Sequence, residues 1–296
     1  MSKPEDPVAP KTPATPSDVY SAGTEALALS PADPAAIVQT ATARFTVLTP
    51  SLTRMEYSDS GQFRDAATQT VTSRAFPVSD FKVRHFDSSE GPGAGLEIIT
   101  SEVRLVYAGG PFASHSLSVF LRRKVENTIH AMWYYGDPPF STNPMATNLG
   151  GTTRTLDEVD GETTLDPGLL STAGVAVLDD SASLPMTADG WVAPRTHPEE
   201  DLYFFGYGHR YKEAIADFFK LSGSSPLLPR AVFGNWWSRY HRYSAKEYTS
   251  LLSDFQDRGI PLSVAVVDMD WHLVDIDPSL GSGWTGYTWN KDLFPD

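Results

Sequence analysis

Two short segments of this chain bring together aromatic, cationic and acidic side chains. The first is Trp236-Trp237-Ser238-Arg239-Tyr240-His241-Arg242-Tyr243, and the second is Asp268-Met269-Asp270-Trp271-His272. A carboxylate accepts hydrogen bonds from hydroxyl groups, and a flat aromatic ring packs against C–H groups. The combination indicates recognition of a neutral sugar.

Two of these residues also have structural interpretations. One alternative is that Asp270 caps a helix or pairs with Arg239. Another is that Trp236 belongs to the core, because tryptophan buries a large area wherever it packs. The sequence leaves both alternatives open.

Metal and nucleotide chemistry have little support. The acidic residues Asp268, Asp270, Asp275 and Asp277 match no EF-hand spacing, and the obligatory glycine and terminal glutamate are missing. His209 and His272 have no histidine four residues away, as a helical zinc motif would require. The sequence holds no glycine-rich phosphate loop of either common type. We therefore expect neither a metal ion nor a cofactor.

Apolar runs precede both chemical segments and predict buried strands. The runs cover 231–237 and 262–267, and a capping box of Ser244 and Glu247 begins a helix between them. The apolar residues of that helix repeat at i, i+3, i+4 and i+7, and Gly259 ends it. A strand, a helix and a strand in this order predict one βαβ unit of a parallel sheet, which binds ligands beyond the carboxyl ends of its strands.

The preceding part of the chain has a different texture. Short runs rich in β-branched and aromatic residues, separated by turn residues, predict an antiparallel β-sandwich. The predicted strands are 45–48, 52–57, 96–99, 103–107, 117–121, 130–135 and 174–178. A helix over 209–221 follows them, with Gly223 as its stop. The predicted domains are a flexible tail (1–38), a β-sandwich (39–200), a linker helix region (201–229) and the start of a barrel (230–296).

Composition limits the classes of partner. The 296 residues carry a formal charge of −14, which disfavours nucleic acid. The chain has no cysteine, and we find no apolar run long enough to span a membrane or serve as a signal peptide. We expect no membrane contact and a cytoplasmic location, with a small sugar or oligosaccharide as ligand. The oligomeric state is open.

A set of motifs in fixed order resembles glycoside hydrolase family 31, which includes α-glucosidases and α-xylosidases. The motifs are Asp201-Leu202-Tyr203-Phe204-Phe205-Gly206-Tyr207-Gly208-His209, Pro226-Leu227-Leu228-Pro229-Arg230, Gly234-Asn235-Trp236-Trp237-Ser238-Arg239-Tyr240, Val267-Asp268-Met269-Asp270-Trp271-His272, Gly286-Tyr287-Thr288-Trp289-Asn290 and Leu293-Phe294-Pro295-Asp296. A weaker likeness extends back through Asn148-Leu149-Gly150-Gly151-Thr152 and Gly168-Leu169-Leu170-Ser171. The resemblance implies an N-terminal β-sandwich followed by the first βα units of a (β/α)8 barrel.

The resemblance also implies roles for particular residues. Asp268 would accept hydrogen bonds from the non-reducing-end sugar, Tyr240 would wall the pocket, and Met269 and Trp271 would line it. Asp157 is the candidate for an acidic residue that a sandwich loop supplies in many relatives. The sequence departs from the common family form at Ser171-Thr172-Ala173-Gly174, where an Arg-Asp or Arg-Gly pair is usual.

The family cleaves α-linked sugars with retention, using two carboxylates about 5 Å apart. The resemblance places both beyond the fourth and sixth barrel strands, so we expect the nucleophile and the acid/base to lie beyond Asp296 and the 296-residue chain to be inactive alone. The alternative is that the chain serves as a non-catalytic carbohydrate-binding or interaction module.

Overall fold

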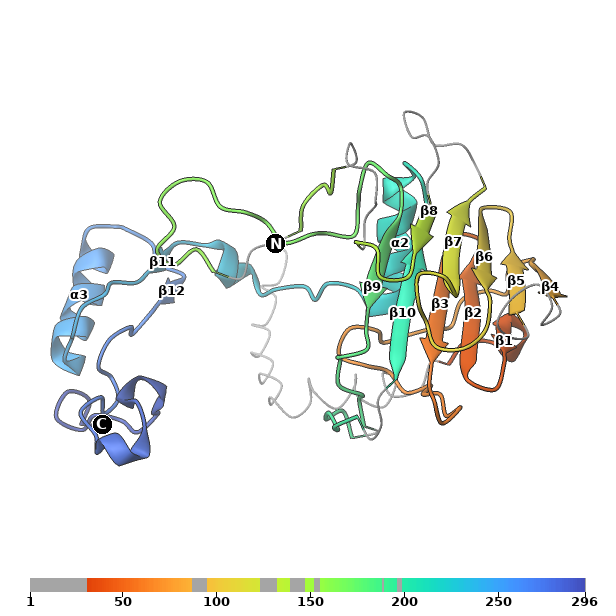
Figure 1. Cartoon of the computed structure of the whole chain (residues 1–296). Coiled ribbons are helices and arrows are strands. Elements are labelled where there is room, and N and C mark those ends of the chain that lie inside the picture. The colour runs from red at the N-terminus through yellow and green to blue at the C-terminus, as the bar shows by residue number, and fades with distance from the viewer. Residues whose placement is uncertain are drawn as a thin grey trace, which may run out of the picture. The chain divides into compact units, whose positions relative to one another are not determined.

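The computed structural model describes residues 31–86, 95–122, 132–138, 147–151, 155–187, 189–195 and 199–295. The chain forms two compact units, Met1–Ser224 and Ser225–Asp296. Each unit is described by itself below, and Figure 1 shows the elements of both.

The first unit contains two antiparallel five-stranded sheets. The first sheet has the order β1-β2-β3-β10-β9, with strands β1 (Ile37–Gln39), β2 (Ala43–Thr49), β3 (Leu52–Tyr57), β10 (Glu200–Phe205) and β9 (Ala176–Asp179). The second has the order β4-β5-β6-β7-β8, with strands β4 (Lys82–Phe86), β5 (Gly95–Ile99), β6 (Val103–Tyr107), β7 (Leu117–Leu121) and β8 (Met132–Tyr134). The predicted antiparallel sheets are confirmed. Residues 130 and 131 of one predicted strand lie outside the described residues.

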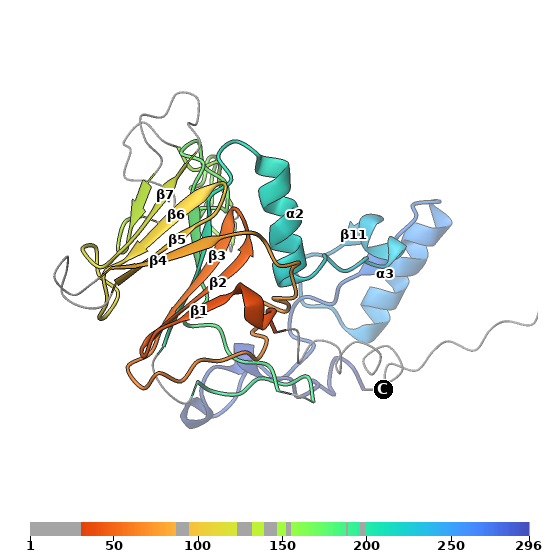
Figure 2. The ribbon, with the colours of Figure 1, turned by 90° about the vertical axis from the view of Figure 1, so that its right-hand side faces the viewer.

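Alternating side chains of the two sheets meet in one core. Phe45, Met55 and Phe204 from the first sheet pack with Ile98 and Leu105 from the second. Since side chains of a strand alternate between its two faces, the residues next to these in sequence point to the other side of the first sheet. The sheets therefore lie face to face, as Figure 2 shows.

Helix α2 (Tyr211–Ser222) covers the outer face of the first sheet (Figure 2). Its Ala214 and Leu221 are buried against Phe205 and Tyr207. The backbone N–H groups of Thr72 and Ser73 donate to the carbonyl of Leu221 at 2.9 and 3.0 Å, which ties a long loop to the end of the helix.

The first unit extends beyond the β-sandwich boundaries that the sequence suggested. Strand β10 pairs with both β3 and β9 and is therefore an internal strand of the first sheet, although the sequence placed most of it in a linker region. The short 3-10 helix η1 (Pro34–Ala36) and strand β1 fall at the end of the predicted tail, and β1 pairs with β2. Sequence reasoning missed β1, β4 and β10.

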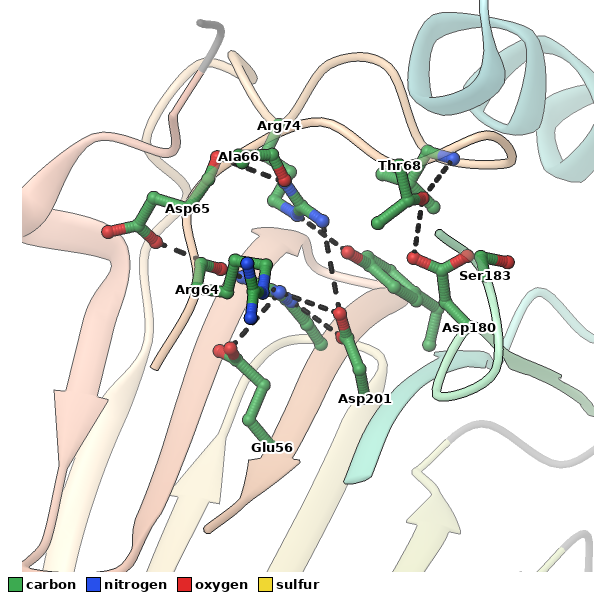
Figure 3. A network of polar contacts seen from close by, with 12 residues as sticks. Glu56, Arg64, Asp65, Ala66, Thr68, Arg74, Asp180, Ser183 and Asp201 are labelled. Carbon is green, nitrogen blue, oxygen red and sulfur yellow. Dashed lines mark hydrogen bonds and ion pairs between the residues drawn. The ribbon is translucent and has the colours of Figure 1, made fainter. Parts of the chain in front are cut away.

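A buried ionic network lies on the same outer face, across strands β2, β3 and β10 (Figure 3). Arg54 donates from Nε and Nη2 to the two carboxylate oxygens of Asp201, both at 2.7 Å. Arg44 donates in the same two-pronged way to Glu56, at 2.7 and 2.8 Å. The register explains these pairs, because Glu56 lies directly opposite Arg44 on β2. Arg54 lies opposite Tyr203 on β10 and is therefore diagonal to Asp201, two residues away.

The same network fixes the loop before residue 76. Arg44 and Arg54 both donate to the carbonyl of Arg64, at 3.1 and 3.0 Å. Arg74 donates to the carbonyl of Ala66 at 3.0 Å and to the Tyr203 hydroxyl at 2.6 Å. Burying a charge costs free energy unless it is paired and hydrogen-bonded, and the carbonyl groups of this loop are acceptors for all three arginines.

Charge pairing and burial act in opposite directions on the carboxyl groups. Burial alone would raise the pKa of Asp201, but Arg54, Arg74 and Arg195 together outweigh it and hold that pKa below its usual range. Burial raises the pKa of Glu56 despite its two arginine partners. Burial also raises the pKa of Asp180, which accepts a hydrogen bond from the Thr68 hydroxyl at 2.7 Å.

The second unit contains one strand–helix–strand arrangement. Strands β11 (Trp236–Trp237) and β12 (Val264–Ala265) are parallel neighbours, and helix α3 (Ala245–Asp257) connects them in sequence. Ser244 caps α3, and the reciprocal bonds of the predicted capping box with Glu247 are both present. The Tyr248 hydroxyl donates to the carbonyl of Val266 at 2.7 Å, which joins the helix to the chain after β12.

The strands of the second unit are shorter than the apolar runs predicted. Residues Arg230–Phe233 form the 3-10 helix η2 instead of extended backbone. Two further 3-10 helices, η3 (Pro278–Leu280) and η4 (Gly283–Thr285), follow β12. In the part of the chain that the structure describes, no helix is long and apolar enough to cross a membrane.

Candidate sugar-binding site

The two chemical segments follow the carboxyl ends of β11 and β12. Because these strands are parallel neighbours, both segments begin at the same edge of the sheet. The predicted juxtaposition of the Tyr240 and Asp268 segments rests on this geometry. The backbone carbonyl of Trp237 accepts from the N–H of Val266 at 2.9 Å, which extends the pairing to the start of the second segment.

The parallel pairing resumes within both segments. Arg242 and Met269 form an isolated parallel bridge. Tyr240 therefore lies in a short arch between Trp237 and Arg242, and Asp268 lies in a facing arch between Ala265 and Met269. Each arch is held at both ends.

Tyr240 and Asp268 present their side chains to solvent. Tyr240 is 74% exposed, and Asp268 is also an exposed residue. Neither has a hydrogen bond or ion pair to another described residue in the structure. A carboxylate and a phenol ring in this state are available to a ligand with hydroxyl groups and C–H faces.

Asp270 has a different environment. Its carboxylate lies 3.6 Å from Nε of Arg242, and its side chain is mostly buried. Its backbone is left-handed, with φ at 54°, which is uncommon outside glycine but tolerated by aspartate. Sequence reasoning offered Arg239 as an ion-pair partner, whereas the structure gives Arg242.

Trp236 lies in β11 and is 53% exposed. Its indole Nε1–H donates to the carbonyl of Val232 at 2.9 Å. The hydrogen bond fixes the ring against the preceding 3-10 helix. Because the residue is half exposed, it does not belong to the core, and its contact with a sugar stays a prediction.

Trp271 forms the centre of an aromatic cluster. Its ring lies 5.0 Å from that of Trp289 and 5.9 Å from that of Tyr287, measured between centroids. Backbone bonds support the arrangement, because Asn290 N–H donates to the carbonyl of Trp271 at 2.8 Å and Leu273 N–H donates to that of Thr288 at 2.8 Å. Tyr287 and Trp289 are exposed, so this cluster presents aromatic rings to solvent three residues after Asp268.

Asp157 belongs to the first unit, whereas the other six predicted site residues belong to the second. It is exposed, and its backbone N–H donates to the Thr155 hydroxyl at 3.0 Å. Its proposed contact with a sugar stays a prediction. Residues 152–154, shortly before it in the chain, lie outside the described residues.

The described residues contain no group of three or more acidic or histidine side chains able to hold a metal ion. A hollow of about 490 Å³ on the second unit is lined by residues between Leu252 and Ala265. These residues precede or form β12, so the hollow lies at the amino end of that strand, whereas Asp268 follows its carboxyl end.

A comparison with protein families identifies the second unit. Residues 225–296 match the model described as "Glycosyl hydrolases family 31 TIM-barrel domain". This part of the chain belongs to glycoside hydrolase family 31. The recognition made from the motifs of the sequence is thereby confirmed.

Two curated relatives in family 31 carry the name α-xylosidase. The one from Saccharolobus solfataricus is 34% identical over 94 residues, which are 32% of this chain and 11% of the relative. The one from Emericella nidulans is 31% identical over 100 residues, which are 33% of this chain and 12% of the relative. The matches cover only a small part of each relative.

Solved family 31 structures share the fold over most of the chain. A dextranase from Flavobacterium johnsoniae, complexed with glucose, has a TM-score of 0.52 at 14% identity, and the match covers 85% of this chain and 33% of the dextranase. An α-xylosidase from a soil metagenome, complexed with xylose, has a TM-score of 0.52 at 13% identity, covering 88% of this chain and 44% of that enzyme. The antiparallel sheets therefore fit the β-rich part of a family 31 protein.

Proposed function

We propose that this chain supplies the sugar-holding part of the first subsite of a retaining α-glycosidase that acts on α-xylosides or α-glucosides. The exposed carboxylate of Asp268 accepts hydrogen bonds from hydroxyl groups of the non-reducing-end sugar. Tyr240 walls the pocket, and Met269 and Trp271 line it. The observation that carries this proposal is the pair of facing arches after β11 and β12, which begin at one sheet edge and hold Tyr240 and Asp268.

The second unit is proposed to form the first βα units of a (β/α)8 barrel. The parallel pairing of β11 with β12 and the helix between them support this, as does the family description of the matched domain. In such barrels, sites form from the loops that follow the strands.

The proposal assigns neither the nucleophile nor the acid/base to a residue of this chain. Retaining hydrolysis needs both carboxylates about 5 Å apart around the scissile bond. The chain by itself therefore holds a sugar and does not hydrolyse its glycosidic bond. That the sugar is α-xylose is suggested by the two α-xylosidases among its relatives.

A titration with methyl α-D-xylopyranoside and methyl α-D-glucopyranoside tests the assignment. We expect the chain to bind at least one of them and Asp268→Asn to abolish binding, because the amide replaces an acceptor-only group and removes its charge. Asp275→Asn is the matched control, since Asp275 is an exposed aspartate that follows the same segment. Equal binding by wild type and Asp268→Asn would refute the role of Asp268.

An activity assay separates the proposal from its alternative. Under the proposal, nitrophenyl α-xyloside and α-glucoside are not turned over by the 296-residue chain. Turnover that Asp268→Asn abolishes would contradict the assignment of both reacting carboxylates outside the chain. Sugar binding without turnover is also what a non-catalytic module would show, so the longer relatives named above provide the active reference.

A further inference from the structure

Arg242 and Asp270 join the two arches at the end away from the strands. Arg242 closes the first arch and Asp270 directly follows Met269, which closes the second. The bridge between Arg242 and Met269 uses backbone atoms only, so the ion pair between Arg242 and Asp270 is the side-chain contact that accompanies it.

The backbone at Asp270 gives this contact a geometric role. Asp270 is a left-handed residue, and it lies between the arch that carries Asp268 and the segment that begins with Trp271. Left-handed conformations of residues other than glycine cost free energy and persist where the surroundings fix them. The Arg242 guanidinium is positioned to fix this one, because the Asp270 side chain is 15% exposed and faces it.

We propose that Arg242 and Asp270 are positioning residues that fix the spacing between the Tyr240 arch and the Asp268 arch. This inference rests on the proposed function. It assigns Asp270 to holding the loop that carries the sugar ligand Asp268, and it adds Arg242, which no motif singled out. The other charged side chain of the first arch, Arg239, is exposed and has no ion pair among the described residues.

The effects of Arg242 and Asp270 on the affinity for the sugar should therefore depend on each other. Opening the pair lets the arches move apart, so each single substitution should weaken binding to a similar extent. An ion pair with one exposed partner contributes modestly, and we expect about a fivefold rise in Kd for Arg242→Gln and for Asp270→Asn. If the two residues act as one device, the double variant also shows about a fivefold rise, whereas independent effects would multiply to about 25-fold.

The experiment is an NMR titration of the whole 296-residue chain with methyl α-D-xylopyranoside, or with the glucoside if only that sugar binds. Asp270→Asn preserves the tolerance of a left-handed backbone, so it removes the charge and leaves the turn. Arg242→Lys keeps the cation and should recover most of the affinity. Arg239→Gln is the matched control, which removes an arginine from the same arch and should leave Kd unchanged.

A merely structural role is distinguished by the rescue and by the coupling. General loosening of the unit would lower the thermal midpoint and would not be corrected by lysine at position 242. The inference is overturned if Arg242→Gln and Asp270→Asn bind as the wild type does, or if their effects multiply. If the wild type binds neither sugar, or if Asp268→Asn binds normally, the proposed function itself fails. If Asp268→Asn loses binding while Arg242→Gln and Asp270→Asn bind normally, this inference alone is refuted.

Discussion

The ion pair between Arg54 and Asp201 should be a principal determinant of the stability of the first unit. Its two hydrogen bonds are 2.7 Å long, and the side chains are 2% and 3% exposed. Asp201→Asn preserves the shape of the side chain and removes its charge. Arg54 would then keep Glu56 as its remaining buried carboxylate partner, and Glu56 is already shared with Arg44.

The magnitude follows from the burial of the cation. Removing one partner of a buried pair costs about 3–5 kcal/mol, because the remaining cation loses its main compensating charge in a site that water does not reach. For a unit of this size, about 1 kcal/mol corresponds to a change of about 2–4 °C in the unfolding midpoint. We therefore expect Asp201→Asn to lower the midpoint of the first unit by about 6–20 °C.

The assays are thermal and urea unfolding, each followed by far-ultraviolet circular dichroism. Glu213→Gln is the matched control, since its ion pair with Arg210 is 60% exposed at the carboxylate and should be worth less than about 1 kcal/mol. Replacing both partners with Arg54→Met and Asp201→Leu should cost less than Asp201→Asn alone, because the buried Arg54 cation is removed together with its carboxylate. A loss below about 1 kcal/mol for Asp201→Asn would refute the reasoning about burial.

Three further predictions concern other residues. Asp180→Asn should stabilise the protein at neutral pH, because burial raises the folded-state pKa of Asp180 and its ionised form therefore costs stability above that pKa. The advantage of the variant should vanish as the pH falls toward the ordinary pKa of aspartate. A series of urea unfolding curves at different pH values measures this. Gly174→Ala should destabilise the first unit by more than Gly110→Ala, although both glycines have φ near 75°. A Cβ at Gly174 would lie 2.5 Å from Gly208 Cα, whereas a Cβ at Gly110 would meet nothing within 4 Å. Equal melting temperatures for the two variants would contradict this. Ser244→Ala should cost about 1 kcal/mol by removing the cap of α3, seen as faster amide exchange in that helix, while Ser253→Ala, within the helix, should change exchange much less.

Alternation and turn residues were sufficient to locate much of the β-rich unit. Strands β3, β6 and β7 have the bounds that the apolar pattern predicted, because each is bounded by turn residues and points alternate side chains to the core. The capping box predicted the start of α3 because its two hydrogen bonds depend only on residues three apart. Local chemistry determines these features.

The elements that were missed depend on distant partners. Strand β4 carries mostly exposed and charged side chains, and its pairing with β5 defines it. Strand β10 begins with Glu200 and Asp201, which look like a polar boundary in the sequence, but Asp201 is buried because Arg54 lies on the neighbouring strand. Such compensation is visible only when the register of the sheet is known.

In the candidate site, too, some features could be predicted from the sequence and others depend on distant partners. The segments that hold Asp268 and Tyr240 could be chosen from residue type and from their position after apolar runs, since parallel strands bring their carboxyl ends to one edge. The choice of these two residues within the segments rests on the resemblance to family 31. The partner of Asp270 could not be chosen, because Arg239 and Arg242 are equally plausible in sequence and the bridge to Met269 selects between them. The indole hydrogen bond of Trp236 to Val232 likewise depends on an unexpected 3-10 helix.

The central claim is that the two arches after β11 and β12 hold a sugar. The most direct measurement is a map of backbone amide shifts of the 296-residue chain during titration with methyl α-D-xylopyranoside and, separately, with the glucoside. The account predicts that the largest shifts with the bound sugar fall on residues 238–242 and 266–271 and disappear in Asp268→Asn. Shifts confined to other parts of the chain, or the same shifts in Asp268→Asn, would contradict it.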